Sequence, residues 1–131
     1  MIQSTFYDGE GMSRVYENEK WMVGLKNWKP ANDRAGIDCL ERHNETDELF
    51  ILLKGTCTLV YATETGPGLD LGAVKMEPLK VYAIPARLWH NTITERDTKL
   101  ALIEDVSTGM ENSDIRALTV EEIESIRDML D

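Results

Sequence analysis

Short strand-like segments separated by polar turns recur along most of the chain, and this repetition limits the possible fold more than any other feature. These segments are rich in apolar, β-branched and aromatic residues, which alternate with polar ones in several of them and run continuously over 49–53. They are residues 6–16, 19–28, 35–43, 48–55, 55–63, 80–93 and 99–106. Turn-forming residues stand between them, as in the Gly-Pro-Gly run at residues 66–68. Closely spaced strands with almost no helix between them are typical of β-sandwiches and barrels. The sequence therefore predicts an all-β core over about residues 15–106.

The C-terminal residues follow a different pattern. Apolar residues recur there at helical intervals, at Val120, Ile123, Ile126 and Leu130. Thr119 and Glu122 have the spacing of a capping box, which marks the start of a helix. We therefore expect a helix over about residues 119–130, packed onto the β core. Because 131 residues suffice for one buried core, the whole chain, 1–131, is expected to be a single domain.

Charge and composition argue against several classes of partner. The formal net charge is -10, which would repel a nucleic-acid backbone. No apolar run approaches the ~20 residues that a membrane-spanning helix needs. The acidic N-terminus lacks the apolar stretch of a secretory signal, so we expect a cytoplasmic protein with Cys39 and Cys57 reduced. A disulfide between them would require that their strands be neighbours.

Two groups of residues have the spacing of known sequence motifs. The first is Glu41-x-His43-x4-Glu48-x6-Gly55, and the second is Leu79-x5-Pro85-x-Arg87-x2-His90. They resemble the two motifs of the cupin superfamily, G-x5-H-x-H-x3,4-E-x6-G and G-x5-P-x-G-x2-H-x3-N. The resemblance covers most of residues 35–105. It implies a double-stranded β-helix of the cupin or jelly-roll type, here with a C-terminal α-helix.

The chain departs from the family motifs at several positions. Glu41 stands where the first family histidine is usual, and Thr94 stands at the final Asn of the second motif. Leu79 and Arg87 occupy glycine positions, and Ala35 occupies the first glycine position of the first motif. The expected metal ligands are therefore two carboxylates and two imidazoles: Glu41, His43, Glu48 and His90.

The spacing of these four residues has a physical meaning of its own. Residues two apart on a strand share a face and lie ~7 Å apart, so Glu41 and His43 can converge inside a barrel. Glu48 would join them across the following turn, and His90 would arrive from a distant strand of the closed sheet. Imidazole nitrogen and carboxylate oxygen are suitable ligands for a divalent ion at ~2.0–2.2 Å. Without a metal, the two close carboxylates would instead form an acid–base pair.

The same residues could instead have purely structural roles. Glu41 would then bond a backbone group at the barrel mouth, His43 would be a satisfied histidine, and Glu48 would begin a strand near solvent. Four further residues are candidates for substrate binding: Arg87, Tyr61, Tyr82 and Phe50. A guanidinium at position 87 would suit a substrate carboxylate, and the three aromatic rings would suit a small-molecule cavity. A solvated loop arginine and ordinary core packing are the alternatives.

The resemblance implies a metal-assisted isomerase, epimerase or lyase that acts on a sugar, a sugar acid or a similar small polar metabolite. Glu48 or Glu41 would move the proton, and the divalent ion would be Mn, Fe, Ni or Zn. Nothing in the sequence indicates a nucleotide or organic cofactor, and dioxygenase chemistry is less favoured because a second carboxylate would occupy an open metal position. The family also implies a homodimer. The alternative is a non-catalytic cupin that binds a small molecule or serves as a structural homodimer, with a vestigial site free of metal.

Overall fold

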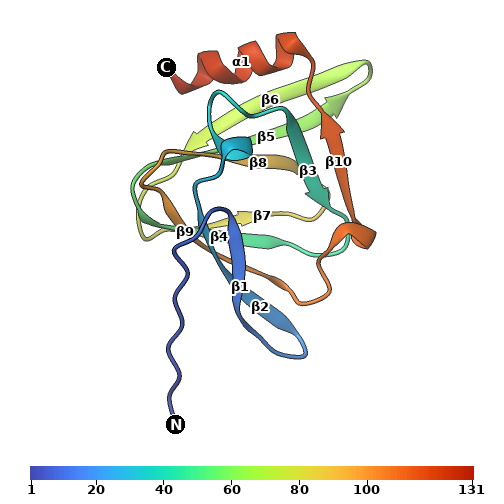
Figure 1. Cartoon of the computed structure of the whole chain (residues 1–131). Coiled ribbons are helices and arrows are strands. Elements are labelled where there is room, and N and C mark those ends of the chain that lie inside the picture. Colours follow the sequence, from blue (N-terminus) through green and yellow to red (C-terminus); the bar gives the residue numbers. More distant parts are fainter.

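The computed structural model describes all 131 residues and shows two antiparallel five-stranded sheets that face each other (Figure 1). In spatial order the first sheet contains β1 (Met12–Glu17), β2 (Trp21–Asn27), β9 (Lys99–Asp105), β4 (Glu48–Lys54) and β7 (Val81–Ile84). The second contains β10 (Ser113–Ala117), β3 (Cys39–His43), β8 (Trp89–Thr94), β5 (Cys57–Thr65) and β6 (Gly68–Lys75). Two short 3₁₀ turns, η1 (Pro30–Asn32) and η2 (Met110–Asn112), and one helix, α1 (Val120–Leu130), complete the fold.

The main core fills the space between the two sheets. Strand β9 shows how the sequence builds it, because its residues alternate between buried and half-buried along the whole strand. The alternate residues that point inward pack with those of β2, β4, β5 and β7. Together they form one apolar cluster: Met22, Phe50, Leu52, Cys57, Leu59, Met76, Ile84, Leu100 and Leu102. This burial of apolar surface between the sheets is what stabilises the barrel.

A second apolar cluster lies on the outer face of the second sheet, beneath α1, which crosses above β5 and β6 (Figure 1). It contains Ile37, Leu40, Val60, Ala62, Trp89, Ile93 and Ile126. The helix begins as the sequence predicts, since the Thr119 side chain accepts a hydrogen bond from the Glu122 backbone N–H and the Glu122 carboxylate accepts one from the Thr119 backbone N–H. Neighbouring residues of β8 therefore serve different layers: Trp89 packs beneath the helix, while His90 faces the barrel interior.

The predicted all-β fold with a C-terminal helix is confirmed, and two strands escaped prediction. Strand β6 lies where a turn was expected, and β10 has no apolar alternation strong enough to reveal it. Both are edge strands, half-exposed along their length, so their sequences carry few buried apolar residues. Strand β3 also begins later than expected, at Cys39, which leaves Ile37 to pack with Leu40 on the opposite face.

Two other expectations concern the thiols and the membrane. Cys39 and Cys57 are both free, and their strands, β3 and β5, are separated by β8. Burial raises the pKa of both thiols, that of Cys57 to about 12. The one α-helix is neither long nor apolar enough to cross a membrane.

Three positions that match motif glycines have left-handed backbone conformations. Gly55, Leu79 and Arg87 have φ angles of 75°, 70° and 72°. A left-handed conformation costs a residue with a side chain roughly 1–2 kcal/mol, and glycine largely avoids this cost. Leu79 and Arg87 therefore keep a backbone conformation typical of glycine, although neither is a glycine. At Arg87 the bend also lets the backbone N–H donate to the carbonyl oxygen of His43, at 2.7 Å.

Replacing Leu79 with glycine is expected to stabilise the protein by up to about 1 kcal/mol, because relief of the strained φ exceeds the entropy cost of glycine. The side chain is 78% exposed, so little apolar burial is lost. Urea unfolding measures the change. Lys80→Gly is the matched control, since Lys80 is exposed and has no positive φ, and it should destabilise the protein. A loss of stability for Leu79→Gly equal to that of the control would contradict the strain argument.

Candidate metal centre

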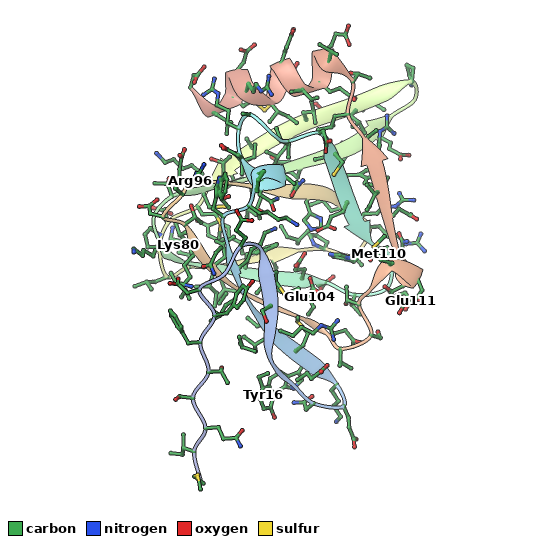
Figure 2. The ribbon with its side chains drawn as sticks, viewed as in Figure 1. Tyr16, Lys80, Arg96, Glu104, Met110 and Glu111 are labelled. Atoms are coloured by element: carbon green, nitrogen blue, oxygen red, sulfur yellow. The ribbon has the colours of Figure 1, made fainter.

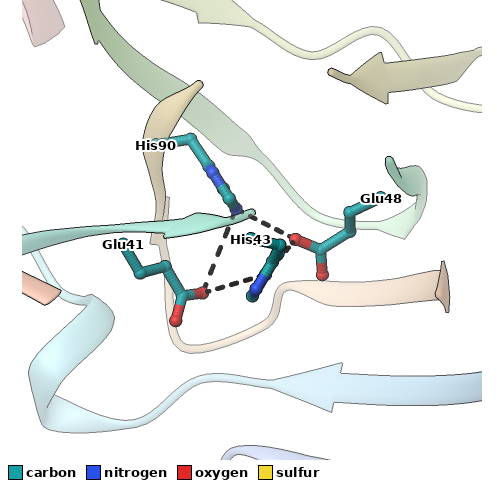
Figure 3. A group of neighbouring side chains, drawn as sticks. All are labelled: Glu41, His43, Glu48 and His90. Carbon is teal, nitrogen blue, oxygen red and sulfur yellow. Dashed lines mark hydrogen bonds and ion pairs between the residues drawn. The ribbon is translucent and has the colours of Figure 1, made fainter. Parts of the chain in front are cut away.

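Four polar side chains from three strands meet at one end of the barrel interior (Figure 3). Glu41 and His43 share a face of β3, Glu48 is the first residue of β4, and His90 lies near the start of β8. The strand register pairs Glu41 directly with His90 on the second sheet, whereas Glu48 faces them from the first. One ligand atom from each of the four residues lies within 4.8 Å of those of the others. The structure therefore brings together all four residues expected to hold a metal.

The distances within this cluster suit ligands around a single ion. His90 Nε2 lies 2.9 Å and His43 Nε2 lies 3.2 Å from Glu48 Oε1. Two atoms each bound at ~2.1 Å to one ion, at right angles, are about 3.0 Å apart. Glu41 Oε1 lies farther away, at 4.0 Å from the Nε2 atom of each histidine. Glu48 and the two histidines thus form the tighter part of the cluster.

The outer nitrogens of the two rings support the same conclusion. His90 Nδ1 lies 3.0 Å from the carbonyl oxygen of Leu88, which can only accept, so Nδ1 carries the proton. In the neutral ring, Nε2 then offers a lone pair that a cation can bind. When no cation is present, a proton on Nε2 makes the 2.9 Å hydrogen bond to Glu48 Oε1. His43 Nδ1 lies 2.8 Å from the Ser113 hydroxyl, which orients that ring. This donor set fits a divalent cation.

The two carboxylates of the cluster differ in environment. Glu48 is 3% exposed. Burial alone would raise the pKa of Glu48, but hydrogen bonds from the two histidines and from Glu104 hold it below its ordinary range. The pKa of His43 is raised, chiefly by its hydrogen bond with Glu48 and against the effect of burial. Glu41 is 41% exposed and forms no hydrogen bond, so it is the member of the cluster that faces solvent.

Glu104, labelled in Figure 2, is an acid beside the cluster that the sequence analysis missed. It pairs with Glu48 across β9 and β4, and its Oε1 lies 3.8 Å from His43 Nε2. Burial raises the pKa of Glu104, and the hydrogen bond to Glu48 and the charge of Glu48 raise it further. Burial and the neighbouring Glu48 thus both favour the neutral form of the Glu104 carboxyl. The signal was present in the sequence, because Leu100, Leu102 and Glu104 alternate on one face of a strand.

Lys26 is a second residue that the sequence analysis missed. It continues the inward-facing row of β2 after Met22 and Gly24, both of which are buried. Burial lowers the pKa of Lys26, and the negative charge of Glu41 opposes this effect. The interior at this end of the barrel thus contains a basic side chain as well as the acids and histidines.

Of the four predicted substrate contacts, the three aromatic residues are neighbours, since Phe50 pairs with Tyr82 across β4 and β7 and Tyr82 lies in one hollow with Tyr61, whereas Arg87 lies apart. Phe50 is in the main core with its ring centroid 6.4 Å from that of His90. Tyr61 and Tyr82 line a separate apolar hollow of about 230 Å³ at the edges β6 and β7. The Arg87 side chain is exposed and forms no hydrogen bond or ion pair within the chain. Phe50 and Tyr61 therefore lie next to the cluster, Tyr61 as the register partner of His90 on β5.

No protein-family model matches the sequence, and no curated protein matches it. Solved structures do. A cupin-2 domain protein from Shewanella frigidimarina has 18% identity and a TM-score of 0.54, over 76% of this chain and 84% of that one. A cupin superfamily protein from Desulfitobacterium hafniense has 15% identity and a TM-score of 0.54, over 78% and 84%. An oxalate oxidase in complex with the substrate analogue glycolate has 14% identity and a TM-score of 0.53, over 73% and 45%.

These similarities are in structure far more than in sequence, and they agree with the paired sheets and with the motif spacing. The double-stranded β-helix predicted from the two motifs is therefore confirmed, and the chain has the fold of the cupin superfamily.

Proposed function

We propose that the protein is a metal-assisted isomerase, epimerase or lyase acting on a sugar, a sugar acid or a similar small polar metabolite. One observation carries this proposal: imidazole and carboxylate lone pairs converge at the inner end of the barrel, at distances suited to a divalent ion. Chemistry of this kind needs a polarised oxygen and a side chain that moves a proton. The cluster offers residues for both tasks.

The residues divide these tasks according to their environment. Glu48, His43 and His90 would hold the ion, because they are the most buried members and lie closest together. The bound ion would polarise a carbonyl or hydroxyl oxygen of the substrate. Glu41 is the freer carboxylate, since it is half-buried and lacks a hydrogen-bond partner. We therefore assign the proton transfer to Glu41 and a ligand role to Glu48.

The substrate class follows from the polarity of the site. Two histidines and two carboxylates suit a guest rich in oxygen. An oxalate oxidase of the same fold has been solved with glycolate, a small hydroxy acid, as its substrate analogue. This likeness supports a small oxygen-rich substrate for the present chain.

Solvent deuterium tests the assignment. Protein purified without chelator would be incubated in D2O with a panel of aldoses, ketoses and sugar acids, and followed by proton NMR. We expect deuterium to enter one compound at the carbon next to its carbonyl, because proton abstraction exchanges that hydrogen with solvent. Glu41→Gln should retain the metal and reduce exchange at least a hundredfold, in the range typical of a lost general base. Glu45→Gln, an exposed neighbour in the β3–β4 turn, is the matched control.

Two results would argue against this function. Exchange that survives EDTA would indicate a metal-free carboxylate enzyme. Metal-loaded protein without exchange on any compound would favour the alternative, a non-catalytic small-molecule-binding protein or structural homodimer. The Glu48–Glu104 pair gives this alternative a structural basis, because a shared proton partly satisfies the cluster without an ion.

A further inference from the structure

A cavity of about 180 Å³ lies beside the candidate metal centre, on the side that Glu41 leaves open. Residues of β2, η1, β3, β8 and β10 line it, and it is open to solvent on one side. Its polar lining consists of Lys26, Lys29, Asn32, Cys39, Glu41 and Asn91. Glu41 belongs both to this lining and to the metal cluster. A molecule in the cavity would therefore reach the metal centre past the Glu41 carboxylate.

Asn32, in this lining, has one polar atom without a partner. The side chain is 3% exposed, and its Nδ2 donates to Asn91 Oδ1 at 2.9 Å and to the carbonyl oxygen of Thr92 at 3.0 Å. Because both partners are acceptors, the amide orientation is fixed, and Oδ1 is left without a hydrogen-bond donor. This oxygen has no exposed surface, so a group in the cavity does not reach it. The acceptor that the cavity offers to a hydroxyl group is the Glu41 carboxylate, which is partly exposed and forms no hydrogen bond.

Lys26 is the second unpartnered group in the lining. Its side chain is half-buried and points inward from β2, and no carboxylate lies within ion-pair distance of its ammonium group. Lys29 is exposed and adds a further positive charge to the same cavity. Two lysines thus line one cavity of a chain whose formal net charge is -10. An anionic group in the cavity would pair with the half-buried Lys26 side chain.

We propose that this cavity binds a small hydroxy carboxylate, with the carboxylate at Lys26 and a hydroxyl at Glu41. The inference rests on the proposed function, because it assigns the cavity to the substrate of that same site. The volume corresponds to about six water molecules at ~30 Å³ each, which suits an acid of about seven non-hydrogen atoms. The carboxylate end is then held by lysine, and the hydroxylated end lies beside Glu41.

Glycerate, glycerol and propionate separate the parts of this proposal, because glycerol lacks the carboxylate and propionate lacks the hydroxyls. Binding would be measured by isothermal titration calorimetry on the full chain, both as purified and after EDTA treatment. We expect glycerol and propionate to bind at least tenfold more weakly than glycerate. In Lys26→Met the Kd for glycerate should rise at least tenfold, and in the control Lys20→Met, an exposed lysine of the β1–β2 turn, less than twofold.

The outcomes are distinguishable from failure of the proposed function. Glycerate binding that disappears with EDTA and is unchanged in Lys26→Met would place the carboxylate on the metal and overturn the proposal. Tighter binding of inorganic phosphate than of glycerate would overturn the carboxylate assignment. Equal binding of all three compounds would do the same even if Lys26→Met failed to fold. Metal content, measured separately, reports on the proposed function alone, since lysine-dependent binding after EDTA treatment needs no ion.

Discussion

Replacing His90 with alanine is expected to reduce bound metal from close to one equivalent per chain to less than a tenth of that. His90 Nε2 is the nitrogen closest to Glu48 Oε1, at 2.9 Å, and its ring is 1% exposed, so no other side chain can take its place. Even residues that only orient a metal ligand commonly change affinity 10–100-fold, and loss of a ligand should exceed that. Elemental analysis by mass spectrometry of protein purified without chelator measures the change.

Thr92→Val is the matched control for this variant. Thr92 lies two residues along the same strand, is equally buried, and its hydroxyl has no hydrogen-bond partner. Valine should fit the same space and leave the metal content unchanged. If His90→Ala retained a full equivalent of metal while folding normally, the ion would be bound elsewhere. If the unaltered protein contained no metal, the proposed function would fail.

Replacing Ile126 with alanine is expected to lower the free energy of unfolding by about 2–5 kcal/mol, the range for large-to-small changes in a core. Ile126 is the one residue of α1 that is fully buried, and it packs into the cluster beneath the helix with Trp89 and Ile93. Truncation would leave a cavity between the helix and the second sheet. Urea unfolding followed by circular dichroism measures the loss.

Val120→Ala provides the comparison, because Val120 is in the same helix and is 68% exposed. A surface change of this kind usually alters stability by less than about 0.5 kcal/mol. If the two variants lost equal stability, the helix would be held by its cap and its own propensity. A large difference would show that burial against the sheet holds it.

The parts of the fold that sequence reasoning found are those whose local pattern matches their burial. Alternation over residues 99–106 appears directly as the inward and outward faces of β9. The spacing of Glu41 and His43 placed them on one face of β3, and the motif spacing brought Glu48 and His90 toward the same point. The placement of Glu41, His43 and Glu48 succeeded because strand period and tight turns are local properties. The placement of His90 came from the resemblance to the family motifs, which carries information on how distant strands pair.

The residues that were missed depend on which faces of distant strands meet. Glu104 and Lys26 become notable only when β9 and β2 are known to face the histidines across the barrel. Their own segments show an acid and a base at the end of an apolar alternation, which is also how an ordinary exposed strand end looks. Arg87 shows the opposite difficulty: its side chain drew attention, whereas its contact with His43 is through the backbone.

Strand β8 has all six residues buried, with Trp89 on the helix side and His90 on the barrel side. This one strand thus separates the apolar cluster beneath α1 from the barrel interior, with no solvent layer or loop between them. A displacement of β8 would therefore move Trp89 and His90 together, because the two residues are adjacent on its backbone. Substitutions in α1 that shift β8 would therefore also shift His90, and so change the geometry of the cluster as well as the stability of the fold. The helix itself contributes no residue to the cluster.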